Sequence, residues 1–130
     1  MLESTIQTNI LHYLKSLKHC EAENVHGDSY SRGRPDINAC FEGTLLRIEV
    51  KTIDHSNAPT EIQKDNLMRW GRAGAICFVA YSLEDVKYVV SDKGLACKGC
   101  LRGNTVYSQC PVKKLYCFTK ICCSLISQLG

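Results

Sequence analysis

The sequence predicts an α/β fold in which a mixed β-sheet is flanked by helices. Three observations predict it: an amphipathic helical pattern opens the chain, two alternating strands follow as a hairpin, and a continuous apolar strand lies between two further helical patterns. A chain of 130 residues has the size of one domain with a single core. We expect that core over residues 1–92, with a cysteine-rich C-terminal extension over residues 93–130 packed on the same domain.

Apolar spacing and turn residues predict the first elements. Isoleucines and leucines recur at helical spacing over residues 3–18, as in an amphipathic helix. Residues 21–28 suit a short strand around Val25. Thr60 is a residue type that caps helices, and a helix is expected from there to Arg72.

The elements after Arg72 are predicted by a change in the spacing of apolar residues. Residues 74–81, GAICFVAY, form a continuous apolar run, which is typical of a strand covered on both faces. Ser82 lies three residues before Asp85 and predicts the capped start of a short helix. A final helix is expected near residues 120–129.

Residues 33–52, GRPDINACFEGTLLRIEVKT, predict a β-hairpin. Glu42 and Gly43 form the natural turn, because glycine tolerates a positive φ and apolar-rich arms flank the pair. With these two residues as the loop, Phe41 pairs with Thr44 and the register of the whole hairpin is set.

This register places Asp36 opposite Glu49, with Lys51 on the same face. Two opposed carboxylates repel and destabilise a hairpin, so a cation between them is expected, and hard oxygen ligands suit Mg²⁺. The alternative is an ordinary solvent-facing strand side on which Lys51 screens the acids. The opposite face is apolar and suits the core: it carries Ile37, Ala39, Leu46 and Ile48.

These residues resemble a known family. Pro35-Asp36 followed by Glu49-Val50-Lys51 resembles the signature of PD-(D/E)xK nucleases. Over about residues 3–90 the wider pattern is similar to the VRR-NUC (virus-type replication-repair nuclease) domain. It consists of Gly33-Arg34-Pro35-Asp36, Ile48-Glu49-Val50-Lys51, Gln63 on the next helix and Gly74-Ala75 before a strand.

The resemblance implies a restriction-endonuclease-like fold and a phosphodiesterase that depends on a divalent metal. Asp36 and Glu49 would bind Mg²⁺ or Mn²⁺, helped by the carbonyl of Val50. Lys51 would position or activate the attacking water and offset charge on the phosphate. This chemistry agrees with the cation site expected from the hairpin alone.

Two further residues enter the site only through the resemblance. Gln63 matches the accessory polar residue of the family, and Glu3 matches an acidic residue on the first helix that completes the site. Without the family resemblance, Gln63 would be an ordinary solvated residue on a helix. Glu3 would be an acidic residue whose charge interacts favourably with the dipole at the start of its helix.

Basic side chains are candidates for a phosphate track around the site, because phosphate contacts supply most sequence-independent affinity. Tyr30 and Trp70 could stack on an unpaired base, although the helical spacing of Trp70 from Leu67 favours the core. No base-reading motif is present, so we expect recognition of DNA shape. The basic candidates are Arg32, Arg34, Arg47, Lys64, Arg69 and Arg72.

The C-terminal extension holds six of the nine cysteines. A CxxC pair fits half of a tetrahedral zinc site, but the second half lacks that spacing, so buried thiols acting as small hydrophobic groups are the alternative. The candidate zinc ligands are Cys97, Cys100, Cys110 and Cys117.

The resemblance to stand-alone VRR-NUC proteins therefore implies a Mg²⁺- or Mn²⁺-dependent DNA endonuclease acting on branched DNA. It would act as a homodimer that resolves four-way (Holliday-type) junctions, because a two-fold dimer supplies the two sites that two symmetric cuts need. The alternatives are a flap, nicking or restriction-like nuclease, and a catalytically silent DNA-binding module with a zinc-bound tail. The N-terminus lacks the pattern of a signal peptide, and no apolar run approaches the roughly 18 residues of a membrane span. An intracellular protein without a membrane partner is expected, in the cytoplasm or encoded by a virus or phage in its host cell.

Overall fold

The computed structural model describes residues 2–25, 33–52 and 59–91. The elements in chain order are α1 (Glu3–Ser16), β1 (Cys20–Asn24), β2 (Ile37–Phe41), β3 (Thr44–Val50), α2 (Glu61–Arg72), β4 (Ile76–Ala80) and α3 (Leu83–Val90). The four strands form one sheet in the order β1-β2-β3-β4. The first two neighbouring pairs are antiparallel and the β3–β4 pair is parallel, so the predicted mixed sheet flanked by helices is confirmed.

The β2–β3 hairpin has the predicted turn and register. Glu42 and Gly43 both have positive φ, 49° and 84°, as a two-residue turn that matches strand twist requires. The strands pair from Phe41↔Thr44 to Ile37↔Ile48. Asp36 lies one residue before this ladder begins, so it is placed by its own hydrogen bonds, described below.

β1 differs from its predicted range. The strand begins at Cys20 and ends at Asn24, where its partner β2 also begins. The N–H of Val25 then donates to the carbonyl oxygen of Asp36, 2.8 Å away. The edge strand therefore ties down the backbone of Asp36 from outside the hairpin.

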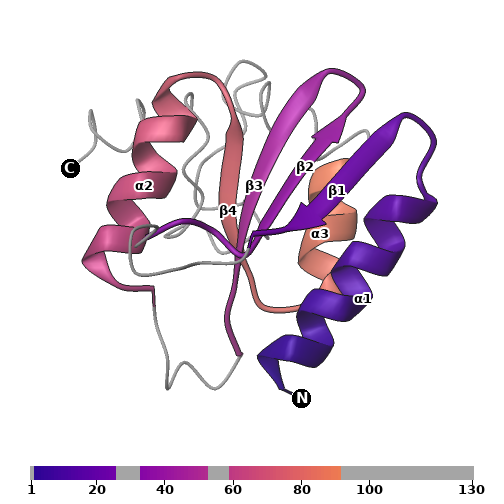
Figure 1. Cartoon of the computed structure of the whole chain (residues 1–130), viewed down its shortest axis with the longest axis horizontal. Helices are drawn as coiled ribbons and strands as arrows, with labels where there is room; N and C mark the ends of the chain where they lie inside the picture. The colour runs from indigo at the N-terminus through magenta and orange to yellow at the C-terminus, as the bar shows by residue number, and fades with distance from the viewer. Residues whose placement is uncertain (1, 26–32, 53–58, 92–130) are drawn as a thin grey trace.

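The main core lies between the sheet and two helices. α1 and α3 cover one face, and α2 lies on the other (Figure 1). Ser82 caps α3 as predicted, since its hydroxyl accepts from the N–H of Asp85. The buried residues on the α1/α3 face include the predicted apolar face of the hairpin together with Ile10, Leu14, Ile76, Phe78 and Val86.

α2 connects the parallel strands β3 and β4 and packs on the second face of the sheet. Its buried residues are Asn66, Leu67 and Gly71, and Leu67 joins a smaller cluster with residues of β4. β4 is buried along its whole length, which confirms the prediction of a strand covered on both faces. Trp70 is 40% exposed, so its assignment to the core was wrong: it lies beside the buried stripe of α2 rather than on it.

Several sequence predictions fall outside the described residues. They are the final helix near residues 120–129, the zinc candidates Cys97, Cys100, Cys110 and Cys117, and the DNA-contact candidates Tyr30 and Arg32. Among the described helices, none is long and apolar enough to cross a membrane.

Candidate active site

The candidate site lies where β3 ends. Glu49 is the penultimate residue of β3, Lys51 follows the strand, and Asp36 immediately precedes the paired partner strand β2. The hairpin register puts all three on the face of the sheet that α2 covers. The parallel neighbour β4 ends beside them, because the N–H of Lys51 donates to the carbonyl oxygen of Ala80 at 3.0 Å. The carboxyl ends of parallel strands are common positions for ligand sites.

Asp36 is held by the backbone on two sides. Its Oδ2 accepts a hydrogen bond from the N–H of Val50 at 2.8 Å, and its own carbonyl accepts from Val25. A carboxylate bonded to a backbone N–H has a fixed orientation. Asp36 is therefore locked onto the end of β3, next to Glu49.

Glu49 is only 1% exposed. Burial, together with a hydrogen bond to Asp36 and the charge of Asp36, raises the pKa of Glu49 from 4.5 to about 9, and the opposing effect of Lys51 is smaller. The metal-free carboxyl therefore holds a proton at neutral pH. Its Oε1 has no hydrogen-bond partner among the described residues, which is costly for a buried polar atom.

Lys51 is the nearest cation to Glu49 in the described chain. Its Nζ lies 3.9 Å from Oε2 of Glu49, and the residue is 6% exposed. The pair is long for a charge-assisted hydrogen bond, and because Lys51 faces Oε2, Oε1 of Glu49 stays without a partner among the described residues.

The burial of this face excludes the alternative of a solvent-facing strand side. Arg47, Glu49 and Lys51 are all buried, and Arg47 contacts Asn66 and Trp70 of α2. Burying charged groups costs several kcal/mol each unless they are well paired. The arrangement therefore lowers stability in the absence of a further partner, which is the pattern of a functional site.

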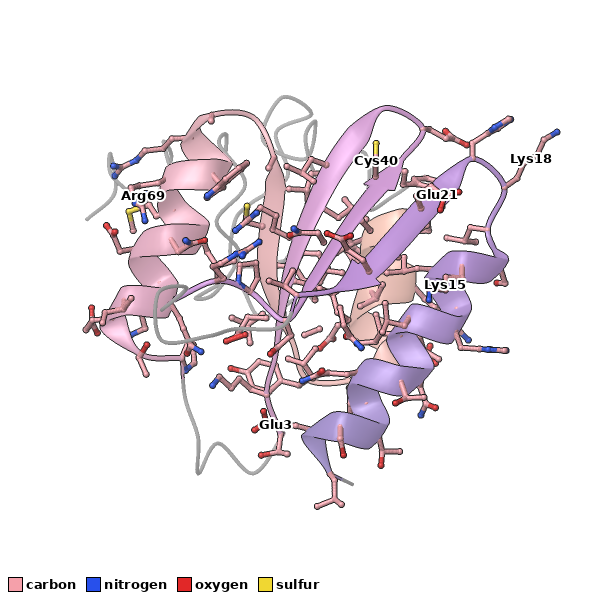
Figure 2. The ribbon with its side chains drawn as sticks, in the orientation of Figure 1. Glu3, Lys15, Lys18, Glu21, Cys40 and Arg69 are labelled. Carbon is pink, nitrogen blue, oxygen red and sulfur yellow. The ribbon has the colours of Figure 1, made fainter. Side chains whose placement is uncertain are left out.

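Glu3 lies close to the same site. It begins α1, and its charge also raises the pKa of Glu49. Figure 2 shows Glu3 at the end of α1 beside the chain that leaves β3. The role in the site that the family resemblance implies for Glu3 remains a prediction.

The donor set suits a hard divalent cation. Glu49 Oε1 is an unsatisfied buried carboxyl oxygen and Asp36 contributes a second carboxylate. Among the described residues, no group of three or more His, Cys, Asp or Glu side chains is arranged as a metal site. Mg²⁺ needs fewer protein ligands, because it is held by one or two carboxylates together with water and substrate phosphate. The two acids therefore fit Mg²⁺ or Mn²⁺ better than a metal that requires a full set of protein ligands.

Gln63 has a structural role that the sequence analysis did not assign. Its Oε1 accepts from the N–H of Thr60 at 2.9 Å, while its own N–H donates to the Thr60 hydroxyl at 3.1 Å. This reciprocal pair is a capping box. Its signal in the sequence is that Gln63 follows Thr60 by three positions. The predicted accessory role of Gln63 remains a prediction.

Gly33 fixes the start of the Asp36 segment against α2. It has a φ of +82°, and a Cβ at this position would lie 2.5 Å from the Cγ2 of Ile62 and 2.9 Å from its carbonyl oxygen. Only glycine allows this close approach. The sequence analysis placed Gly33 in the motif but gave no physical reason for it.

The predicted DNA-contact residues lie in different environments. Arg34 is exposed, whereas Lys64 is partly buried and pairs with Glu61 at 3.3 Å. Arg47 is 4% exposed; its Nη2 donates to Oδ1 of Asn66 at 3.1 Å. Arg47 thus lies under α2.

Comparison of the chain with models of known protein families found no match. Curated proteins and solved structures likewise gave no match.

Proposed function

We propose that this protein is a Mg²⁺- or Mn²⁺-dependent DNA endonuclease of the PD-(D/E)xK type, with Asp36, Glu49 and Lys51 as its catalytic residues. One observation carries the proposal: a buried Glu49 carboxyl lies against the fixed carboxylate of Asp36, with one oxygen unsatisfied among the described residues. A fold has no need of such a pair for stability. A cation that replaces the proton of Glu49 would satisfy both acids at once.

Each residue has a distinct part in the proposed chemistry. Asp36 and Glu49 hold the metal, with the Val50 carbonyl as the further ligand implied by the VRR-NUC resemblance. When bound, the metal polarises the scissile phosphate and lowers the pKa of a coordinated water. Lys51 directs its ammonium group to the same place, where it orients the attacking water and offsets charge on the phosphate.

The element order supports the family assignment as a proposal. A helix is followed by an antiparallel hairpin that presents the acids, and a crossover helix then leads to a parallel strand. This is the order expected for a restriction-endonuclease-like core, on which the VRR-NUC resemblance rests. Glu3 at the start of α1 is included in the proposed site because it lies within electrostatic reach of Glu49.

The proposed substrate is branched DNA, and the proposed assembly is a homodimer. The basic residues form no base-reading motif, so binding to linear duplex should be weak and should fall steeply with salt. A two-fold dimer would present two sites to opposed strands of a four-way junction and would gain effective concentration from both arms. Light scattering of the purified protein should give twice the chain mass of 14.5 kDa.

The experiment is a cleavage assay with end-labelled four-way, flap and linear DNA in Mg²⁺, Mn²⁺, Ca²⁺ or EDTA. We expect cleavage in Mg²⁺ and Mn²⁺, with paired cuts in the junction. Ca²⁺ should support binding with little cleavage, because its looser coordination positions water poorly. Cleavage at full rate in EDTA would exclude the metal mechanism. A monomer that cuts linear duplex as fast as junctions would exclude the dimeric junction enzyme.

A further inference from the structure

Trp70 lies on α2 with a large part of its ring exposed, beside a small pocket. The pocket has a volume of about 300 Å³, at the lower end of the range for small-molecule sites. The hairpin turn forms one wall and the loop between α2 and β4 forms the other, and Trp70 lies between them. The lining residues are Gly43, Thr44, Leu45, Trp70, Ala73, Gly74 and Ala75.

The indole ring is held from beneath by a buried cation. The guanidinium carbon of Arg47 lies 3.9 Å from the centroid of the Trp70 ring, a cation–π contact. Arg47 is itself anchored by Asn66 and is almost fully buried. Trp70 is therefore fixed in place before any ligand arrives, which lowers the entropic cost of stacking on it.

The charge of Arg47 is not balanced by an acid in the described chain. Its Nε has no hydrogen-bond partner among the described residues. Burial lowers the pKa of Arg47, and the nearby arginines Arg34 and Arg69 lower it further. A buried cation without a carboxylate partner is costly, and it attracts an anion to this part of the surface.

The same arginines connect the pocket with the candidate active site. Arg34 lies two residues before Asp36, and Arg69 precedes Trp70 on α2. Figure 2 shows Arg69 at the end of the molecule away from Glu3, and its guanidinium is partly offset by Asp65 at 2.9 Å. Arginines thus lie both near Asp36 and near Trp70, with the buried Arg47 on the strand between them.

We propose that the Trp70 pocket binds one unpaired nucleobase of the DNA strand whose phosphate lies at the Asp36–Glu49 site. The inference rests on the proposed nuclease function and adds one feature to the branched substrate: an unpaired base on the strand that is cut. The base stacks on the exposed face of Trp70, opposite the face that Arg47 covers. Its backbone follows the positive charge of the arginines.

The length of β3 sets the spacing between the base and the cut. The pocket adjoins Thr44 and the acids lie near Val50, at the two ends of β3. Six steps at about 3.4 Å give about 20 Å. This corresponds to about six nucleotides at the rise of stacked DNA, and to fewer in an extended strand. A fully paired linear duplex offers no free base at that distance.

Intrinsic fluorescence tests the proposal directly, because Trp70 is the sole tryptophan of the chain. Full-length protein is titrated in EDTA, so that binding is measured without cleavage. The two probes are duplexes of equal length, one blunt-ended and one with a ten-nucleotide single-stranded arm. We expect the armed duplex to quench the emission strongly and the blunt duplex to change it little.

Two variants separate stacking from general binding. Measured by fluorescence anisotropy of labelled probes, which needs no tryptophan, Trp70→Ala should weaken binding of the armed duplex by about 5- to 150-fold, the usual contribution of one stacked base, and leave the blunt duplex unchanged. Trp70→Phe should restore most of the affinity. Leu2→Ala, at an exposed apolar residue that precedes α1, is the matched control and should bind both probes as the wild type does.

Equal quenching by both probes, or an unchanged affinity of Trp70→Ala for the armed duplex, would overturn the base subsite. The wild-type titration decides the question even when a variant fails to fold. These binding measurements need no cleavage, so the base subsite and the nuclease function can be excluded independently of each other. Cleavage without Trp70 quenching leaves the nuclease and removes the subsite, whereas quenching without metal-dependent cleavage does the reverse.

Discussion

The carboxylate of Asp36 accepts a hydrogen bond from the backbone N–H of Val50, with Oδ2 and the nitrogen 2.8 Å apart. This bond joins the loop before β2 to the end of β3, where Glu49 is buried. It explains how two acids that repel each other stay in contact: one is fixed by the backbone and the other holds a proton in the metal-free protein.

The first prediction separates the hydrogen bond of Asp36 from its charge. Asp36→Asn keeps an oxygen that can accept from Val50, whereas Asp36→Ala leaves that N–H without its acceptor. We expect the free energy of unfolding of the Ala variant to lie about 1.5–3 kcal/mol below that of the Asn variant, as measured by urea denaturation at pH 7. Neither variant should cleave DNA.

Relief of acid repulsion, taken alone, would leave the thermal stability of Asp36→Ala unchanged or raise it. The bond to Val50 acts in the opposite direction, and that expectation now applies to the Asn variant. Equal stability of the two variants would show that the bond contributes nothing.

The second prediction concerns pH and the stability of the metal-free protein. The unfolded chain releases the Glu49 proton near pH 4.5 and the folded chain near pH 9. The bound proton of Glu49 raises the free energy of unfolding of the folded chain. This contribution is fully present below pH 4.5 and is lost as the pH rises to about 9. The slope from this group is at most about 1.4 kcal/mol per pH unit. Urea denaturation in EDTA between pH 5 and 9 measures it.

Glu49→Gln should remove this slope and be more stable than the wild type at pH 8. Glu23→Gln, at an exposed acid on β1, should retain the slope of the wild type. Parallel pH curves for the wild type and Glu49→Gln would mean that Glu49 titrates normally.

The third prediction tests the close approach at Gly33. Gly33→Ala places a methyl group against Ile62 at a positive φ. It should lower stability by about 1–2 kcal/mol through backbone strain and by about 1–3 kcal/mol through overpacking. Cleavage should also fall, because the shift moves Asp36.

Gly43→Ala is the matched control for Gly33. Gly43 has nearly the same φ, +84°, but no atom within 4 Å of the added Cβ. The stability of this variant should show the strain alone. Because Gly43 also lines the Trp70 pocket, the two variants are compared by their melting curves: if the curves coincide, the contact with Ile62 adds no overpacking.

The fourth prediction distinguishes the two roles of Gln63. Thr60→Ala and Gln63→Ala both break the capping box, and each should lower stability by about 0.5–2 kcal/mol. If Gln63 also serves the active site, as the resemblance implies, Gln63→Ala should lower the cleavage rate much more than Thr60→Ala does, at a temperature well below the melting temperature of both variants. Equal rates for the two variants would leave Gln63 as a capping residue only.

The hairpin could be predicted because its signals are local. Gly43 requires a positive φ, a two-residue turn fixes the register, and alternation then determines which residues share a face. The pairing from Phe41↔Thr44 onward followed directly. The caps at Thr60 and Ser82 were predictable for the same reason, since each involves residues three positions apart.

The environment of the site could not be predicted in this way. Arg47 is buried under α2, where it contacts Asn66 and Trp70, and the packing of a crossover helix depends on contacts distant in sequence. Trp70 shares helical spacing with Leu67, but the buried stripe of α2 passes through Gly71 instead. A helical pattern does not show which of two adjacent stripes meets the sheet.

The central claim is that Glu49 belongs to a metal-dependent nuclease site, and one comparison tests it most directly. The initial rate of cleavage of a labelled four-way junction in Mg²⁺ is measured for Glu49→Gln and for Glu23→Gln, which make the same chemical change inside and outside the site. The account predicts that Glu49→Gln loses at least about a hundredfold in rate while remaining folded, and that Glu23→Gln cleaves as the wild type does. Cleavage by Glu49→Gln at the wild-type rate would contradict it.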